Sequence, residues 1–273
     1  MMKLPGEVEE GVAVVTGGGS GIGRALCRAL AQSGTGRIVV ADLHFDAAEQ
    51  VAAAIRSARA GCAAVALALD VGEEQAVEHA VSRIEADIGP ISLWCSNAGV
   101  HLGEGLGETD DWKKSLAVNL MGHVNAARAV MPRMASRGKG YFVITASAAG
   151  LLTDFRCAPY AASKHAAVAF AEWLSIAHAD NGIAVSCVCP EGVRTGMTRP
   201  DSVKTGAASD FLEPEDVARE VVEALTTRRF LVLPHPRVAE YERRRTADRE
   251  NWLERMRAVR RKLMPAVSSA AAS

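Results

Sequence analysis

Short runs of apolar and β-branched residues alternate along the chain with longer, alanine-rich segments in which apolar residues recur at helical spacing. Most of the short runs are apolar throughout, which is typical of strands covered by helices on both faces. The predicted strands are Val12–Thr16, Arg37–Asp42, Ala63–Asp70, Ile91–Ser96, Gly140–Ser147, Ile183–Cys189 and Phe230–Leu233. The predicted helices are 21–33, 46–60, 73–88, 110–137, 158–181 and 214–226. This alternation predicts an α/β fold with a doubly wound, seven-stranded parallel sheet and helices on both faces.

Two segments depart from this alternation. Residues 191–213 are rich in Gly, Thr, Ser and Asp, which predicts a long loop. A loop of that length is often a lid over a ligand, and a connector without a role is the alternative. After Pro234, residues 235–273 carry ten basic and five acidic residues, a net charge of +5. We expect a domain over 5–234 and a basic C-terminal extension over 235–273, with a helix of about seven turns and a disordered end at 268–273.

Composition limits the partners of the chain. The net charge of the 273 residues is −1 and aromatic residues make up 5%, so nothing indicates nucleic-acid binding. No window approaches the roughly 18 consecutive apolar residues that span a bilayer, and the charged N-terminus lacks the layout of a signal peptide. The six cysteines are scattered through apolar segments, which favours buried, reduced thiols in a cytoplasmic protein. No group of residues has the spacing of a metal site.

A glycine-rich turn follows the first predicted strand. Thr16 is followed by glycines at 17, 18, 19, 21 and 23, and a predicted helix begins within this run. Glycine lets the backbone turn sharply and approach a pyrophosphate, whose charge the N-terminus of a helix stabilises. The G-x-x-x-G-x-G spacing resembles the short-chain dehydrogenase/reductase family, and this resemblance implies a Rossmann-type domain that binds a dinucleotide. The residues expected to contact the cofactor here are Gly17, Gly19, Ser20, Gly21, Ile22 and Gly23.

Asp42, at the end of the second predicted strand, bears on the choice between NAD and NADP. Its carboxylate can accept hydrogen bonds from both ribose hydroxyls of NAD and would repel the additional phosphate of NADP. A turn or helix-capping aspartate is the alternative. The resemblance also places the ends of the third and fourth strands at the adenine pocket, with Ser96 where the family has asparagine; the residues implied are Asp70, Val71, Asn97, Ala98 and Gly99. The expected cofactor is NAD.

Four further residues resemble the catalytic tetrad of the same family in order and spacing: Asn119, Ser147, Tyr160 and Lys164. Tyr160 and Lys164 are four residues apart on a predicted helix, so their side chains share a face. Oxidising a secondary alcohol needs a base for the hydroxyl proton, and tyrosine titrates at about pH 10. We expect the ammonium group of Lys164 to favour the phenolate and so to lower the pKa of Tyr160. Ser147 can orient the substrate oxygen. The resemblance implies that Lys164 also binds the nicotinamide ribose and that Asn119 anchors a water relay.

The residues after the sixth predicted strand depart from the family pattern. Where the family has Pro-Gly, this chain has Pro190-Glu191 followed by a glycine, and Glu191 either contacts substrate or points to solvent. The resemblance places Pro190, Val193 and Thr195 against the cofactor, with Thr195 at the nicotinamide carboxamide.

The expected substrate is a small hydrophobic alcohol or ketone, because most candidate pocket residues are apolar. These residues are Val100, His101, Leu102, Leu151, Leu152, Phe155, Val193 and Met197. His101 and Arg156 either bind an anionic group or are solvated. The sequence therefore predicts an NAD-dependent oxidoreductase with Tyr160 as its acid/base. A non-catalytic NAD sensor or scaffold and an NADP-dependent carbonyl reductase are the alternatives.

Small residues recur in the predicted helices 110–137 and 158–181 and would let two subunits approach closely. In the family that the chain resembles, these helices pair across a two-fold axis, which implies a homodimer or homotetramer. For the extension over 235–273, packing on its own domain or on a sister subunit is favoured over contact with a membrane surface.

Overall fold

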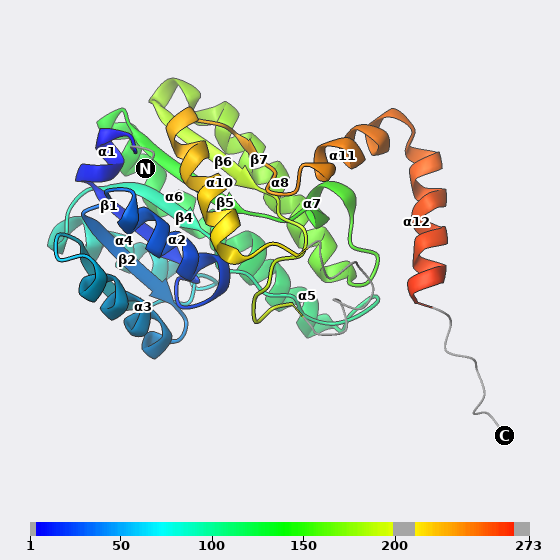
Figure 1. Ribbon diagram of the computed structural model, residues 1–273, viewed down its shortest axis with the longest axis horizontal. Coiled ribbons are helices and arrows are strands. Elements are labelled where there is room, and N and C mark those ends of the chain that lie inside the picture. The colour runs from blue at the N-terminus through cyan, green and yellow to red at the C-terminus, as the bar shows by residue number, and fades with distance from the viewer. Residues whose placement is uncertain (1–3, 199–210, 265–273) are drawn as a thin grey trace.

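A seven-stranded parallel sheet forms the centre of the molecule (Figure 1). The computed structural model describes residues 4–198 and 211–264. The strands lie in the order β3-β2-β1-β4-β5-β6-β7, and all neighbours are parallel. They are β1 (Val12–Thr16), β2 (Arg37–Asp42), β3 (Ala63–Ala68), β4 (Ile91–Ser96), β5 (Gly140–Thr145), β6 (Ile183–Val188) and β7 (Leu231–Val232). The direction of winding reverses between β1 and β4, so the predicted doubly wound, Rossmann-type sheet is confirmed.

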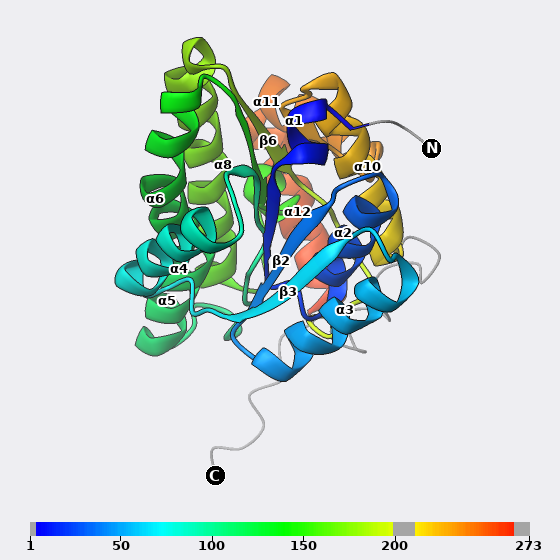
Figure 2. The same cartoon turned by 90° about the vertical axis from the view of Figure 1, so that its left-hand side faces the viewer.

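Helices cover both faces of this sheet, as predicted (Figure 2). One face carries α2 (Gly21–Gln32), α3 (Phe45–Ala58) and α10 (Pro214–Thr227). The opposite face carries α4 (Glu74–Asp87), α6 (Gly122–Arg137) and α8 (Ala158–His178). The shorter helical segments are α1 (Gly6–Glu10), α5 (Thr109–Leu116), η1 (Ala117–Met121), α7 (Ala149–Leu152) and η2 (Ala179–Asn181).

The strands supply two separate cores because successive side chains point to opposite faces of a sheet. Val12 and Val14 pack on the side of α4, α6 and α8, whereas Ala13 and Val15 pack on the side of α2, α3 and α10. All four side chains are fully buried. Burying a valine side chain stabilises the fold by roughly 1.5–3 kcal/mol, so residues that face either side of the sheet must be apolar.

The helix predicted over 110–137 contains a π-helical turn. α5 ends at Leu116, η1 (Ala117–Met121) follows as a π-helix, and α6 continues from Gly122. Such turns occur frequently at functional sites because the wider turn displaces the side chains of one face. Asn119 lies in this turn. The apolar period of the sequence continues through the segment, so periodicity alone predicts one regular helix.

The C-terminal extension contains two helices, which corrects the prediction of a single helix of about seven turns. α11 (Arg237–Ala247) and α12 (Arg249–Leu263) are separated at Asp248, whose backbone is extended, with φ −149° and ψ 93°. Its carboxylate accepts a hydrogen bond from the Asn251 amide at 3.0 Å and so caps α12. The predicted disordered end at 268–273 lies outside the described residues.

The extension is attached to the domain through α11. Val238 of α11 is fully buried and Trp252 of α12 is 8% exposed, and both belong to the core on the side of α8. The rings of Tyr241 and Trp252 lie 6.2 Å apart between their centroids. α11 lies against α7, and α12 projects beyond it away from the sheet (Figure 1). In the described part of the chain, no helix has both the length and the apolar character needed to cross a membrane.

Candidate active site

A glycine cradle connects β1 to α2 at the carboxyl end of the sheet. Gly17 and Gly21 have φ angles of +63° and +48°, a conformation that glycine adopts without steric penalty. A Cβ atom on Gly23 would lie 2.1 Å from the Gly17 carbonyl oxygen, so a side chain here would push the helix away from the loop. Ser20 precedes α2 in extended conformation, and Ile22 lies in its first turn. The first amides of a helix lack partners within it, so this cradle fits the phosphates of a dinucleotide.

Asp42 is attached to the cradle through its carboxylate. Oδ2 accepts a hydrogen bond from the Gly19 amide at 3.0 Å, and Oδ1 accepts one from the His44 amide at 3.0 Å. The second bond is the local turn interaction that the alternative interpretation of this residue predicted. It leaves the carboxylate with accepting capacity, because each oxygen can accept two hydrogen bonds. Asp42 can therefore hold the turn and also accept hydrogen bonds from ribose hydroxyls.

The segments that follow β4 and β3 support the cradle from the other side. The Asn97 side-chain amide donates to the Thr16 carbonyl at 3.0 Å, and the Ala98 backbone amide donates to Thr16 Oγ1 at 3.1 Å. These bonds fasten the end of β4 to the end of β1. After β3, Asp70 accepts a hydrogen bond from the Gly72 amide at 2.9 Å, and Val71 is buried. Both segments are thus built mainly as backbone supports.

Ser96 contacts a buried histidine that sequence reasoning did not identify. Its Oγ lies 2.7 Å from Nδ1 of His123, which belongs to α6. Burial lowers the pKa of His123 to about 3, and the charge of Lys164 acts in the same direction. His123 is therefore neutral near pH 7 and exchanges a hydrogen bond with Ser96 without adding charge to the site. A single histidine on a helix carries no local signal of this role.

Ser147, Tyr160 and Lys164 converge beside the carboxyl end of β5. Lys164 is 3% exposed, donates from Nζ to the Thr145 carbonyl at 3.0 Å, and lies 5.8 Å from the centroid of the Tyr160 ring. Ser147 accepts a hydrogen bond from the Ala149 amide at 3.1 Å, and its Oγ donates to the Pro190 carbonyl at 3.5 Å. A Cβ atom on Gly99 would lie 3.4 Å from Lys164 Nζ. Lys164 Nζ thus lies close to Gly99, in the segment after β4 that supports the cradle.

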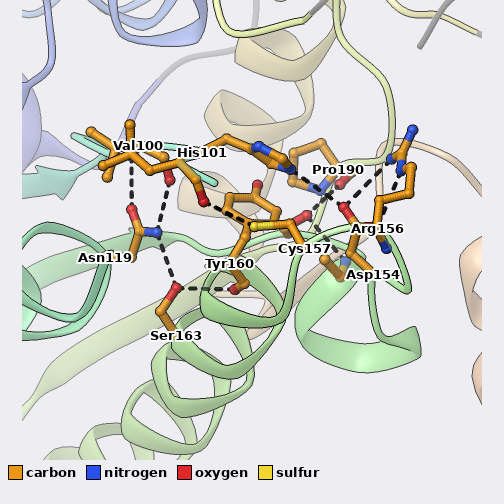
Figure 3. A network of polar contacts seen from close by, with 12 residues as sticks. Val100, His101, Asn119, Asp154, Arg156, Cys157, Tyr160, Ser163 and Pro190 are labelled. Atoms are coloured by element: carbon orange, nitrogen blue, oxygen red, sulfur yellow. Dashed lines mark hydrogen bonds and ion pairs between the residues drawn. The ribbon is translucent and has the colours of Figure 1, made fainter. Parts of the chain in front are cut away.

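Asn119 reaches the same region from the π-helical turn. Its side chain is fully buried: Oδ1 accepts from the Val100 amide at 2.8 Å, and Nδ2 donates to the Val100 carbonyl at 2.9 Å and to Ser163 Oγ at 3.0 Å. Ser163 in turn donates to the Tyr160 carbonyl at 3.0 Å. Figure 3 shows this group of bonds beside Tyr160. The Asn119 side chain therefore holds the loop after β4 in register with α8.

The pKa values of the tyrosine and lysine follow mainly from burial. Burial raises the pKa of Tyr160 to about 12; the hydrogen bond with Ser147 lowers it, and the charge of Asp154 raises it further. Burial lowers the pKa of Lys164 to about 8. In the protein without ligands the pKa of Tyr160 is therefore raised, not lowered as the sequence led us to expect, although Lys164 Nζ lies 5.8 Å from the centroid of the ring.

A second polar group lies on the other side of Tyr160, and its central residue was missed by sequence reasoning. His101 Nε2 lies 3.4 Å from Asp154 Oδ2, and Arg156 Nε donates to Asp154 Oδ1 at 3.1 Å. Burial alone would raise the pKa of Asp154, but the bonds from His101 and Arg156 outweigh it and lower the pKa to about 2. His101 and Arg156 are thus paired with a carboxylate. The position of Asp154 between Ser147 and Tyr160 was the available signal.

Glu191, which replaces the family's glycine, forms an ion pair with the C-terminal extension. Its Oε2 accepts from Arg237 Nε of α11 at 2.5 Å, and its backbone amide donates to His235 Nδ1 at 3.2 Å. The side chain is 20% exposed. Neither interpretation from the sequence, substrate contact or a solvated charge, describes this position: Glu191 fastens α11 to the loop after β6.

The predicted lid lies partly outside the described residues, which omit 199–210. Its two ends pair with each other, since the Arg194 amide donates to the Leu212 carbonyl at 3.0 Å and Val193 forms a parallel bridge with Leu212. Val193 is buried, and the carbonyl of Pro190 accepts from the Ala148 amide at 2.8 Å. Thr195 lies against the cradle, where its side chain would be 3.0 Å from a Cβ atom on Gly21. The loop after β6 therefore spans from the catalytic group to the cradle.

All six cysteines are buried thiols, as the sequence predicted. Cys187 and Cys189 lie on the same side of the chain, with their sulfur atoms 3.7 Å apart. The hydrogen bond with Cys189, together with burial, raises the pKa of Cys187 well above its usual range, so it is protonated near neutral pH.

Known dehydrogenases are similar to this chain in sequence. A meso-2,3-butanediol dehydrogenase of Serratia marcescens is 33% identical over 216 residues, which are 76% of this chain and 84% of that protein. A 1-deoxy-11-beta-hydroxypentalenate dehydrogenase of Streptomyces exfoliatus is 38% identical over 224 residues, 80% of each chain.

Solved structures agree with these relatives. A short chain dehydrogenase/reductase of Burkholderia phymatum, solved in complex with NAD, superposes with a TM-score of 0.82 at 30% identity and covers 90% of this chain and 96% of that chain. Residues 11–205 match the short chain dehydrogenase family. With this match over most of the domain, and with the cradle and the tyrosine–lysine pair placed on the fold, the chain belongs to the short-chain dehydrogenase/reductase family.

Proposed function

We propose that this chain is an NAD-dependent dehydrogenase that interconverts a secondary alcohol and a ketone on a hydrophobic small molecule, with Tyr160 as its acid/base. The observation that carries the proposal is the convergence of Ser147, Tyr160 and Lys164 beside a glycine cradle that fits a dinucleotide. The relatives described above are dehydrogenases of alcohols, which supports the same reaction class.

The cofactor would lie along the carboxyl end of the sheet. We propose that its phosphates lie at the cradle, its adenosine ribose at Asp42, its adenine beside Asp70 and Val71, and its nicotinamide beside Pro190, Val193 and Thr195. Asn97, Ala98 and Gly99 would support this arrangement from behind. Bound NAD would supply the acceptor for the hydride.

The residues of the chain then carry the proton. Ser147 holds the substrate oxygen, the alcohol carbon loses a hydride, and the hydroxyl proton passes to the oxygen of Tyr160. The products are the ketone, the reduced cofactor and one proton. Because burial raises the pKa of Tyr160 to about 12, the positive charges of Lys164 and of the bound nicotinamide must lower it before it can act as a base. Asn119 would anchor the relay that returns the proton to solvent.

The choice of NAD over NADP rests on the negative charge of Asp42 beside the cradle. NAD should bind more tightly by on the order of tenfold, because Asp42 repels the ribose phosphate of NADP and accepts from the ribose hydroxyls of NAD. Fluorescence titration of both cofactors measures this difference, and Asp42→Ala should narrow it. Tighter binding of NADP would favour the alternative, an NADP-dependent carbonyl reductase.

The reaction is tested by NADH formation, measured by absorbance, with a panel of secondary alcohols. The panel contains matched pairs that differ by one hydroxyl: butan-2-ol and butane-2,3-diol, cyclohexanol and cyclohexane-1,2-diol, and 1-phenylpropan-1-ol and 1-phenylpropane-1,2-diol. Turnover of at least one compound, abolished in Tyr160→Phe, is expected. NAD binding without turnover of any compound would contradict the proposal and favour an NAD sensor or scaffold.

We also propose that the chain forms a homodimer or homotetramer through α6 and α8. Trp173 and Ile176 of α8 are 60% and 81% exposed, and large apolar side chains on one helix favour an interface. Ile176→Glu should shift the assembly toward monomer in light scattering, whereas a monomeric parent protein would contradict the proposal.

The six buried thiols favour a cytoplasmic location, and we propose residues 5–234 as the catalytic domain with 235–273 as its extension.

A further inference from the structure

Two loops on the substrate side of Tyr160 are fastened to each other. The loop after β4 and the loop before α8 meet where the Gly105 amide donates to the Arg156 carbonyl at 2.7 Å and the Ala158 amide donates to the Gly105 carbonyl at 2.8 Å. Cys157 Sγ adds a contact of 3.0 Å to the Leu102 carbonyl. These bonds join the backbone just after His101 to the backbone just after Asp154, so main-chain contacts as well as their own hydrogen bond hold the two side chains near each other.

The imidazole of His101 lies over the ring of Tyr160. The two ring centroids are 4.4 Å apart with an interplanar angle of 43°, and Figure 3 shows the imidazole beside Tyr160, with its bond to Asp154 as a dashed line. The side chain of His101 is 24% exposed, whereas that of Asp154 is 7% exposed. His101 is therefore partly accessible beside the ring of Tyr160, whereas Asp154 is covered.

The state of Asp154 determines which nitrogen of His101 carries hydrogen. Bonds from His101 and Arg156 hold the pKa of Asp154 at about 2, so its carboxylate is ionised and only accepts hydrogen bonds. Nε2 of His101 is then the donating nitrogen, so Nδ1 is an acceptor in the neutral form of the ring. Within residues 4–198 and 211–264, no hydrogen bond uses Nδ1. An acceptor without a protein partner thus lies next to Tyr160.

Charge argues against an anionic ligand here. Arg156 is the nearest permanent cation of this group, and its guanidinium is engaged by the same carboxylate at 3.1 Å. The pair is close to neutral overall, so a carboxylate on the substrate would find little compensation for lost hydration. A hydroxyl group, which can donate to Nδ1, matches the site better.

We propose that His101 is a specificity-determining residue that accepts a hydrogen bond from a second hydroxyl of the substrate, on the carbon next to the reacting one. The proposal rests on the proposed function, because a substrate oxygen bound at Tyr160 brings its neighbouring carbon beside the imidazole. The substrate class is a vicinal diol, or an α-hydroxy ketone in the direction of reduction. Asp154 is a positioning residue that fixes the tautomer of His101.

The test compares each diol of the panel with its matched mono-alcohol, as the ratio of their kcat/KM values. The parent protein should prefer the diol by about tenfold or more, the amount that one buried hydrogen bond contributes to discrimination. His101→Phe keeps an aromatic ring over Tyr160 but removes both nitrogens, so the ratio should fall toward one. His79→Phe, an exposed position on α4, is the matched control and should keep the parent ratio.

Two further variants separate hydrogen bonding from structure. His101→Gln restores a side-chain acceptor and should recover part of the preference that His101→Phe loses. Asp154→Asn removes the charge that selects the tautomer and should lower the ratio even where thermal unfolding and NAD binding match the parent protein. A structural role alone would not change the ratio in this way.

The outcomes distinguish this inference from the proposed function. Turnover with no preference for the diols, or a preference that survives in His101→Phe, would overturn the inference and leave the dehydrogenase activity intact. Absence of turnover for all six compounds would overturn both, because the inference depends on an oxygen bound at Tyr160.

Discussion

The cofactor half and the substrate half of the candidate site are held together in different ways. The glycine cradle depends on backbone geometry, since Gly17 and Gly21 have positive φ and Gly23 leaves no room for a Cβ atom. The substrate half depends on charged side chains, with Asp154 between His101 and Arg156, and Glu191 against Arg237.

This difference has consequences for both stability and specificity. An added atom in the cradle must displace backbone, whereas a partly exposed ion pair such as Glu191–Arg237 contributes only about 0–1 kcal/mol. The cofactor half should therefore tolerate few substitutions, and the substrate half should change its preference through single side chains. Tyr160 and Lys164 lie where the two halves meet, so their variants should affect both.

The largest effect is expected at the boundary, from Tyr160→Phe. Removing the hydroxyl abolishes proton transfer, so turnover should fall by about 100-fold or more, while NAD binding stays within about twofold. Steady-state NADH formation and fluorescence titration measure the two quantities. Activity above about a tenth of the parent level would show that another group is the base.

Gly23→Ala should disrupt the cofactor half alone. The new Cβ atom would lie 2.1 Å from the Gly17 carbonyl oxygen, and relieving that contact should lower the free energy of unfolding by about 1–3 kcal/mol and weaken NAD binding by at least about tenfold. Gly61→Ala is the matched control, because nothing lies within 4 Å of its Cβ position. Equal NAD affinity in both variants would refute the packing argument.

Lys164→Met should show how much burying the charge of Lys164 lowers the free energy of unfolding. Burial lowers the pKa of Lys164 from 10.5 to about 8, so the folded protein loses the proton more easily than the unfolded chain. Below about pH 8 this opposes folding, and the penalty is relieved as pH rises toward 10.5. At pH 7 the ligand-free variant should be more stable than the parent by about 1–2 kcal/mol, and this difference should shrink by pH 10.

The same variant should bind NAD less tightly and lose activity, because the proposed ribose contact disappears. Chemical denaturation at pH 7 and pH 10 tests the stability change. A variant that is less stable than the parent at pH 7 would mean that the hydrogen bond to the Thr145 carbonyl outweighs the cost of burying the charge.

The smallest effect is expected from Glu191→Gln in the substrate half. The side chains of Glu191 and Arg237 are 20% and 38% exposed, so the pair should contribute less than about 1 kcal/mol to the free energy of unfolding. A double-mutant cycle with Arg237→Gln isolates the interaction. A coupling as large as the effect of Gly23→Ala would show that the two halves do not differ as described.

The sequence by itself determined the strand–helix order, the position of the cradle and the tyrosine–lysine pair. Each of these depends on local rules: strand burial requires apolar runs, a phosphate-binding turn requires glycine, and a spacing of four places two side chains on one helix face. Local rules also predicted Asp42 at the end of β2, with its turn hydrogen bond as one of two alternatives.

Only the tertiary structure decided which distant residues form ion pairs and hydrogen bonds with each other, and which side chains are buried away from water. Asp154 bonds to His101, 53 positions away, as well as to the neighbouring Arg156, and Glu191 bonds to Arg237, 46 positions away. Burial, which raises the pKa of Tyr160 and lowers that of Lys164, depends on the whole surrounding core. The apolar periodicity also did not predict the break between α11 and α12 at Asp248, because one extended residue barely changes an amphipathic pattern. Pattern reasoning predicts local geometry, whereas hydration and ion pairing depend on which segments pack together.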